Sequence, residues 1–114
     1  MWIASKLGFF SVVAHKSEPE TTQIRARVRQ DLVNLLAHHG RSKKGQATPI
    51  IETLDSDYRF RIIVPKKTAT KMVEEMARDI DYPNFKTAIA GLPDQREKLH
   101  AYHEIWHSMA RLQP

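Results

Sequence analysis

The sequence predicts an α+β fold: a four-stranded antiparallel sheet with helices on one face. Two segments alternate apolar and polar side chains, which is the period of a strand buried on one face. Other segments repeat apolar side chains every three or four positions, as amphipathic helices do. The predicted element order is β-β-α-β-β-α-α-α, which is a ferredoxin-like order permuted so that the last strand comes first.

The first half of the chain predicts two strands and a helix. Residues 8–15 are rich in Phe and Val and predict the first strand, and residues 16–20 predict a turn. Residues 21–30 predict the second strand, because two sets of side chains alternate there: Ile24, Ala26 and Val28 against Arg25, Arg27 and Arg29. From Asp31 the apolar spacing becomes helical, and Gly40 is placed to end that helix.

The middle of the chain predicts a hairpin. Residues 40–49 form a basic loop, residues 49–54 a third strand, and residues 55–57 a turn. Residues 57–64 predict a fourth strand whose side chains alternate, with an inward set and an outward set: Tyr58, Phe60, Ile62 and Val64 inward, and Arg59, Arg61 and Ile63 outward.

Three helices follow Pro65. Apolar positions between residues 69 and 80 predict an amphipathic helix, and a short helix ending near Gly91 follows the break at Pro83. Pro93 then opens the last helix, whose expected core stripe is Leu99, Tyr102, Trp106 and Met109.

Composition predicts one small domain over residues 1–114. With 41% hydrophobic residues, a chain of 114 residues can bury a core without metal or disulfides. The absence of cysteine excludes thiol nucleophiles and cysteine-bound zinc, and it fits a reducing, cytoplasmic compartment. We expect no cofactor.

Residues 1–14 resemble a signal peptide only in part. One lysine precedes a short apolar run over residues 7–14, but Gly8 and Ser11 interrupt that run. No stretch approaches the ~18 apolar residues of a membrane span. We therefore expect a strand in a cytoplasmic protein without a membrane partner. The sequence does not decide whether Trp2 lies in the core or on the surface.

Basic residues are in excess, and several are predicted to share one surface. Lys plus Arg is 18 against 13 Asp plus Glu, a net charge of +5, which favours polyanionic partners. If the apolar side of the strands faces the helices, the open sheet face carries five arginines: Arg25, Arg27, Arg29, Arg59 and Arg61. Either Phe9 or Phe10 must join them, and loop residues Lys43 and Lys44 would add phosphate contacts.

A charged sheet face also has a simpler interpretation. It can serve only to solvate the sheet, with Glu52 or Glu20 pairing some of the arginines. It can equally contact an acidic protein.

The segment HEIWH, residues 103–107, has the spelling of a zinc-protease helix. Such a site needs His103 and His107 as ligands, Glu104 as general base and a third protein ligand. Only SMARLQP follows, and it contains no ligand. At 100° per residue the two histidines turn away from the expected core stripe. We therefore expect no catalytic metal site here, although the histidines remain candidates for weak metal binding.

Two further patterns have simpler explanations. GRSKKGQA, residues 40–47, has the glycine spacing of a phosphate-binding loop, but Gln46 and Ala47 stand where Lys and Ser or Thr are needed. The polar residues Asp79, Asp81 and Asn84 beside Pro83 are expected to cap helices and form turns.

Several segments together resemble a family of small bacterial proteins with no established activity. They are GFFSVV, RARVR, DYRFRIIVP, DYPNFK and YHEIWHSMARLQ, in the same order along nearly the whole chain. The resemblance implies no catalytic residues. It implies that Tyr102 and Trp106 belong to the pattern, whereas a histidine at position 107 is not typical.

These observations predict a small non-catalytic binding protein whose arginine-rich sheet face engages nucleic acid or another polyanion. The alternative is a protein-interaction module or small regulator, using the same face or the exposed end of the last helix, and able to form a homodimer. A zinc-dependent hydrolase acting through HEIWH is the remote alternative.

Overall fold

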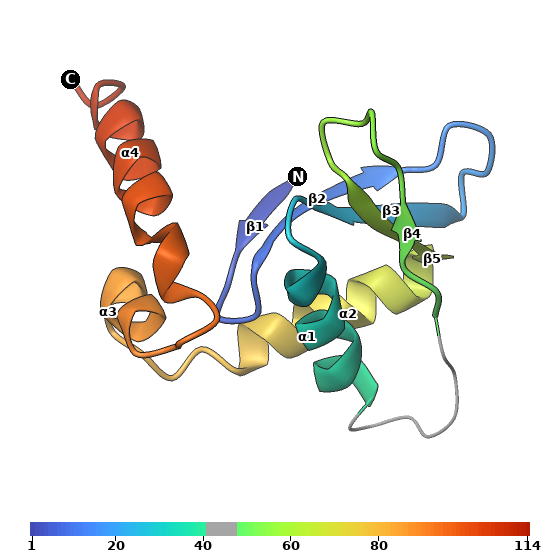
Figure 1. The fold of residues 1–114 in the computed structure, drawn as a ribbon, viewed down its shortest axis with the longest axis horizontal. Coiled ribbons are helices and arrows are strands. Elements are labelled where there is room, and N and C mark those ends of the chain that lie inside the picture. Colours follow the sequence, from blue (N-terminus) through green and yellow to red (C-terminus); the bar gives the residue numbers. More distant parts are fainter. Residues whose placement is uncertain (41–47) are drawn as a thin grey trace. The chain divides into compact units, whose positions relative to one another are not determined.

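The computed structural model describes residues 1–40 and 48–114 and contains two compact units. The first spans Met1–Ile80 and holds the whole sheet, and the second spans Asp81–Pro114 and is helical (Figure 1). The single-domain organisation expected from the chain length stays a prediction.

The sheet of the first unit has five antiparallel strands in the described residues, so the predicted count of four was wrong. The strands follow the order β1-β2-β3-β5-β4. Their bounds are β1 Trp2–Ala4, β2 Phe9–Ala14, β3 Thr21–Ala26, β4 Ile51–Glu52 and β5 Phe60–Pro65. The unexpected strand is β1, whose three residues are too few to show an alternating pattern.

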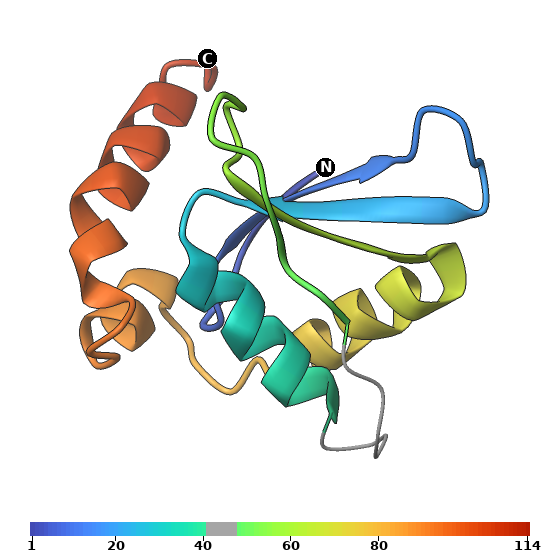
Figure 2. The same ribbon diagram turned by 45° about the vertical axis from the view of Figure 1, so that its right-hand side comes forward.

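Two helices cover one face of this sheet. Helix α1 spans Arg29–Gly40 and α2 spans Lys66–Arg78, and Figure 2 shows both on the same side of the strands. The core between them includes strand residues Phe10, Ile24, Ala26, Ile62 and Val64 and helix residues Leu32, Leu35, Ala69, Met72 and Met76. Burying a leucine or isoleucine side chain in such a core contributes about 2 kcal/mol. The predicted α+β class with an antiparallel sheet is confirmed.

The second predicted strand ends earlier than its sequence pattern. Strand β3 stops at Ala26 and α1 already begins at Arg29, so Arg29 belongs to a helix and not to the strand row. Val28, predicted to be buried, is 44% exposed. The reason is a tertiary contact: Asp31 is fully buried in the first turn of α1, where its carboxylate accepts a hydrogen bond from Phe9. The start of the helix is set by this contact and not by the alternation.

The turn between β1 and β2 is attached to the start of α1. Oδ2 of Asp31 accepts from the Phe9 amide at 3.2 Å, and Nδ2 of Asn34 donates to the Leu7 carbonyl at 2.9 Å. Gly8 lies against the same carboxylate, since a Cβ atom at this position would stand 2.3 Å from Cγ of Asp31. A glycine is therefore required at this position.

The ends of α1 and α2 are joined by two histidine–carboxylate pairs. Nε2 of His38 contacts Oδ2 of Asp79, and Nδ1 of His39 lies 2.7 Å from Oε1 of Glu75. Asp79 follows the last residue of α2 and caps that helix, as predicted, and its side chain in addition contacts His38. Asn84 caps α3 as predicted, because its side chain accepts from the Thr87 amide at 2.9 Å.

The second unit is built from helix α3 (Phe85–Ala90), the short helix η1 (Arg96–Lys98) and helix α4 (Leu99–Ala110). The ring of Phe85 packs edge-on against Tyr102, with 5.1 Å between centroids. The predicted core stripe of α4 was wrong beyond Tyr102, because Trp106 is 58% and Met109 59% exposed. A six-residue α3 is about 9 Å long and a twelve-residue α4 about 18 Å, so α3 cannot cover all of α4.

Within the residues described, no helix combines the length and the apolar character that crossing a membrane requires.

The contact at Gly8 predicts a large loss of stability in Gly8→Ala. The added methyl group would push Asp31 away and break its bond to the Phe9 amide, so we expect unfolding to become easier by about 2–4 kcal/mol in urea. Gly40→Ala is the matched control, since a Cβ atom there meets no atom of the described residues within 4 Å. Equal midpoints for the two variants would contradict this account.

Candidate nucleic-acid interface

The face of the sheet opposite the helices carries one row of residues across all five strands. The register pairs Trp2 with Ser11, Ser11 with Arg25, Arg25 with Arg61, and Arg61 with Ile51. Ile24 and Ala26, the neighbours of Arg25 in β3, are buried in the helix-covered core. Since side chains alternate along a strand, the whole row lies on the other face, called here the open face.

Two arginines of this row are held in place by neutral acceptors. Nη2 of Arg25 donates to Oγ of Ser11 at 2.8 Å. Nη1 of Arg61 donates to Oε1 of Gln23 at 3.1 Å, and its Nη2 donates to Oγ of Ser56 at 2.8 Å. Both side chains are half-buried. Their guanidinium groups are therefore held in a fixed orientation, and the groups that hold them do not neutralise their positive charge.

The ring of Tyr58 contacts the guanidinium groups of both Arg25 and Arg27. Cζ of Arg25 lies 4.6 Å and Cζ of Arg27 lies 4.2 Å from the ring centroid, which is cation–π distance. The Tyr58 carbonyl also accepts from Nη2 of Arg61 at 3.4 Å. The prediction that Tyr58 points inward to the helices was wrong. It lies in the turn before β5, where the strand alternation does not apply, and is buried against the arginines instead.

We call Arg25, Arg27, Arg61 and Tyr58 the arginine cluster. Among the described residues, no carboxylate forms an ion pair with any of its three arginines. The Nε atoms of Arg25 and Arg61 are moreover buried and receive no hydrogen-bond partner from residues 1–40 or 48–114. Three guanidinium charges that lie on one small area and form no ion pair with a described carboxylate favour an anionic ligand.

The remaining predicted arginines lie outside this cluster. Arg59 pairs with Glu52 at 2.7 Å, as the sequence had suggested for one arginine of the face. Arg29 is exposed at the start of α1. Lys43 and Lys44 fall outside the described residues. The structure therefore brings together three of the five predicted arginines and separates two.

Aromatic side chains complete the open face at its β1 edge. Phe10 is fully buried in the core, so Phe9 is the one of the two that lies on the open face. Trp2 packs against Phe9 with 6.0 Å between ring centroids, and it is 70% exposed. Sequence reasoning missed the role of Trp2, because its face is known only once β1 pairs with β2.

The HEIWH segment does not form a metal-binding geometry. His103, Glu104 and His107 are all exposed on α4, and no group of three or more His, Cys, Asp or Glu in the described part of the chain is placed to hold an ion. Glu104 pairs with His100 at 2.8 Å, and His103 stacks on Trp106 at 5.7 Å. Glu104 and His103 therefore contact neighbours on their own helix.

A separate cavity of about 390 Å³ lies in the first unit, between the β2–β3 hairpin and α2. Its walls are mainly apolar, with Val12, Val13 and Val73 among them. None of the predicted arginines or histidines lines it.

A scan against protein-family models and searches among curated proteins and solved structures found no match to this chain. The resemblance to a bacterial family stays a prediction. Function therefore has to be inferred from the chemistry of the site.

Because the Tyr58 ring is buried, we expect it to contribute to the free energy of unfolding. Tyr58→Ala removes a ring that is 4% exposed and leaves two guanidinium groups without their stacking partner, so we expect a loss of about 2–4 kcal/mol. Tyr58→Phe keeps the ring and should lose much less. Chemical unfolding of both variants provides the measurement, and equal losses would show that the ring contacts are unimportant.

The exposed histidines of α4 predict little tightly bound metal. After loading with zinc and dialysis, we expect metal analysis to find far less than one equivalent per chain, because no three potential ligands in the described part of the chain are placed to hold an ion. A full equivalent that disappears in His103→Ala would establish a site that this geometry does not contain.

Proposed function

We propose that the protein is a non-catalytic binding protein whose open face engages nucleic acid. The observation that supports this most strongly is the arginine cluster, in which Arg25, Arg27 and Arg61 surround Tyr58 without a carboxylate partner in the described residues. A sheet face that needed only solvation would be expected to pair such charges. Phosphate groups are the ligands that guanidinium forks match best.

The three arginines can play different parts in binding. Arg25 and Arg61 are oriented by Ser11 and by Gln23, so they would lose little conformational freedom when a phosphate binds. Arg27 is exposed, and it can contact a phosphate directly. Together they would position a nucleic-acid backbone without reading its sequence.

The fold interpretation supports the same proposal. We propose that strands β2, β3, β5 and β4, with helices α1 and α2 on one face, form a permuted ferredoxin-like sheet; the strand order supports this. Neither α1 nor α2 covers the second face, and in other proteins such a sheet face binds single-stranded RNA. A cytoplasmic location is part of the proposal.

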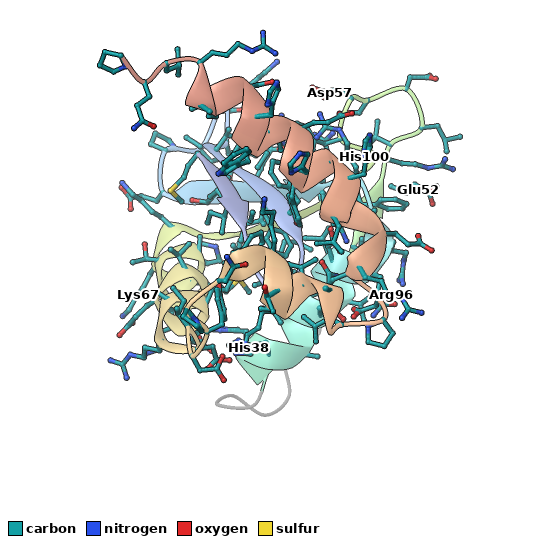
Figure 3. The ribbon with its side chains drawn as sticks, turned by 90° about the vertical axis from the view of Figure 1, so that its left-hand side faces the viewer. His38, Glu52, Asp57, Lys67, Arg96 and His100 are labelled. Atoms are coloured by element: carbon teal, nitrogen blue, oxygen red, sulfur yellow. The ribbon has the colours of Figure 1, made fainter. Side chains whose placement is uncertain are left out.

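The proposal predicts a charge-specific loss of binding. Fluorescence anisotropy of a labelled oligonucleotide should show that Arg27→Glu weakens binding at least tenfold, with a smaller salt dependence than wild type. Lys67→Glu changes the net charge equally but lies on α2, and Figure 3 shows it at the side of the unit away from Glu52 on β4. It should weaken binding far less.

The salt dependence gives the second readout of the same titration. Three phosphate contacts on a single strand predict a log–log slope of about −2, and loss of one contact reduces it by about 0.7. If both charge variants weaken binding equally, only net charge matters and the open face is not the site. If wild type does not bind at low salt, the proposal fails.

A second candidate function is self-association through α4. Ile105, Trp106 and Met109 lie on one side of the helix, within an arc of about 100°, and all are exposed. Leu112, one turn further, is also exposed. Such a stripe can pack against its own copy across a two-fold axis, which is the commonest symmetry of oligomers, although Lys86 lies over the ring of Trp106 at 4.8 Å and would have to move aside.

This candidate predicts a concentration-dependent dimer. Sedimentation equilibrium should show association in the high micromolar range, because the stripe is smaller than the surface that a stable dimer buries. The double variant Trp106→Ala, Met109→Ala should remain monomeric. Wild type that is monomeric at every concentration excludes this dimer.

A further inference from the structure

The β1 edge of the open face carries an aromatic surface that the arginine cluster does not use. Trp2 stands opposite Ser11 in the register, and its ring leans on Phe9 at an interplanar angle of 56°. Phe9 therefore supports the indole from one side. With 70% of the residue exposed, much of the indole remains available to a planar ligand.

This aromatic surface and the arginine cluster share one row of the sheet. Neighbouring strands lie about 4.8 Å apart, so Trp2 on β1 stands roughly 10 Å from Arg25 on β3 and roughly 14 Å from Arg61 on β5. A few nucleotides of an extended strand cover such a length. Between them in the row lies Ser11, a buried side chain whose hydroxyl accepts a hydrogen bond from Arg25 at 2.8 Å.

We propose that the open face binds single-stranded nucleic acid, with a base stacked on Trp2 and adjacent phosphates bound at Arg27 and Arg25. This inference rests on the proposed function, because the arginines supply the electrostatic attraction. In a duplex the base faces are covered by their neighbours, so Trp2 can contribute only when the strand is single. Every base has a stacking face, and we therefore expect little sequence preference.

The stacking can be observed directly at Trp2. In a Trp106→Phe background, Trp2 is the sole tryptophan, since the chain contains two. Probes are single-stranded RNA and DNA of about ten nucleotides, the corresponding duplexes, and inorganic polyphosphate. We expect indole fluorescence to be quenched by either single strand and to stay unchanged when polyphosphate binds.

Affinities of Trp2 variants separate stacking from charge. Trp2→Ala should weaken single-strand binding tenfold or more with an unchanged salt slope, because no charge is removed, and Trp2→Phe should recover part of the loss. Leu54→Ala is the matched control, because Leu54 is also 70% exposed and lies in the β4–β5 turn. Its affinity should equal that of wild type. Thermal unfolding checks that each variant is folded.

The possible results distinguish this inference from the proposed function. If Trp2→Ala binds single strands as wild type does, or loses polyphosphate binding to the same extent, the stacking inference is overturned. Tighter binding of duplex than of single strands also overturns it. In each case a selective loss in Arg27→Glu would still support the arginine cluster as a nucleic-acid site. If wild type binds none of the probes, both proposals fail.

Discussion

The packing of two helices against one face of the sheet is the constraint on which the rest of the structure depends. Helices α1 and α2 pack on Ile24 and Ala26 of β3, and this fixes the direction of every neighbouring side chain. Arg25 must then lie on the opposite face, where the register brings it beside Ser11 and Arg61. The positive surface is therefore a consequence of how the apolar core is built.

Partial burial of charge is the main energetic cost of this surface. A half-buried guanidinium group loses water, and a carboxylate partner would restore that energy while cancelling the charge. Here Nη atoms of Arg25 and Arg61 donate to neutral acceptors, and the ring of Tyr58 adds a cation–π contact with Arg25. The charge is stabilised and yet stays available to an anion. This combination favours ligand binding over a purely structural role.

Agreement between sequence and structure is best where local pattern and tertiary contact act together. The α+β class, the helices and the inward set Ile24, Ile62 and Val64 follow from periodicity, because each pattern matches the face that is buried. Strand β1 is too short to produce a pattern. Trp106 fits a core stripe, but the contact it receives from α3 is the Lys86 side chain, and it remains 58% exposed.

The sequence by itself determined the antiparallel α+β architecture, the excess of positive charge and the placing of Arg25 and Arg61 on the face away from the core. These depend on composition and on the two-residue period, which are local properties. Only the tertiary structure decided which arginines stay unpaired and that Tyr58 joins them. It also brought Trp2 onto the same row. These features depend on strand register and on a turn, which arise from contacts between residues distant in the chain.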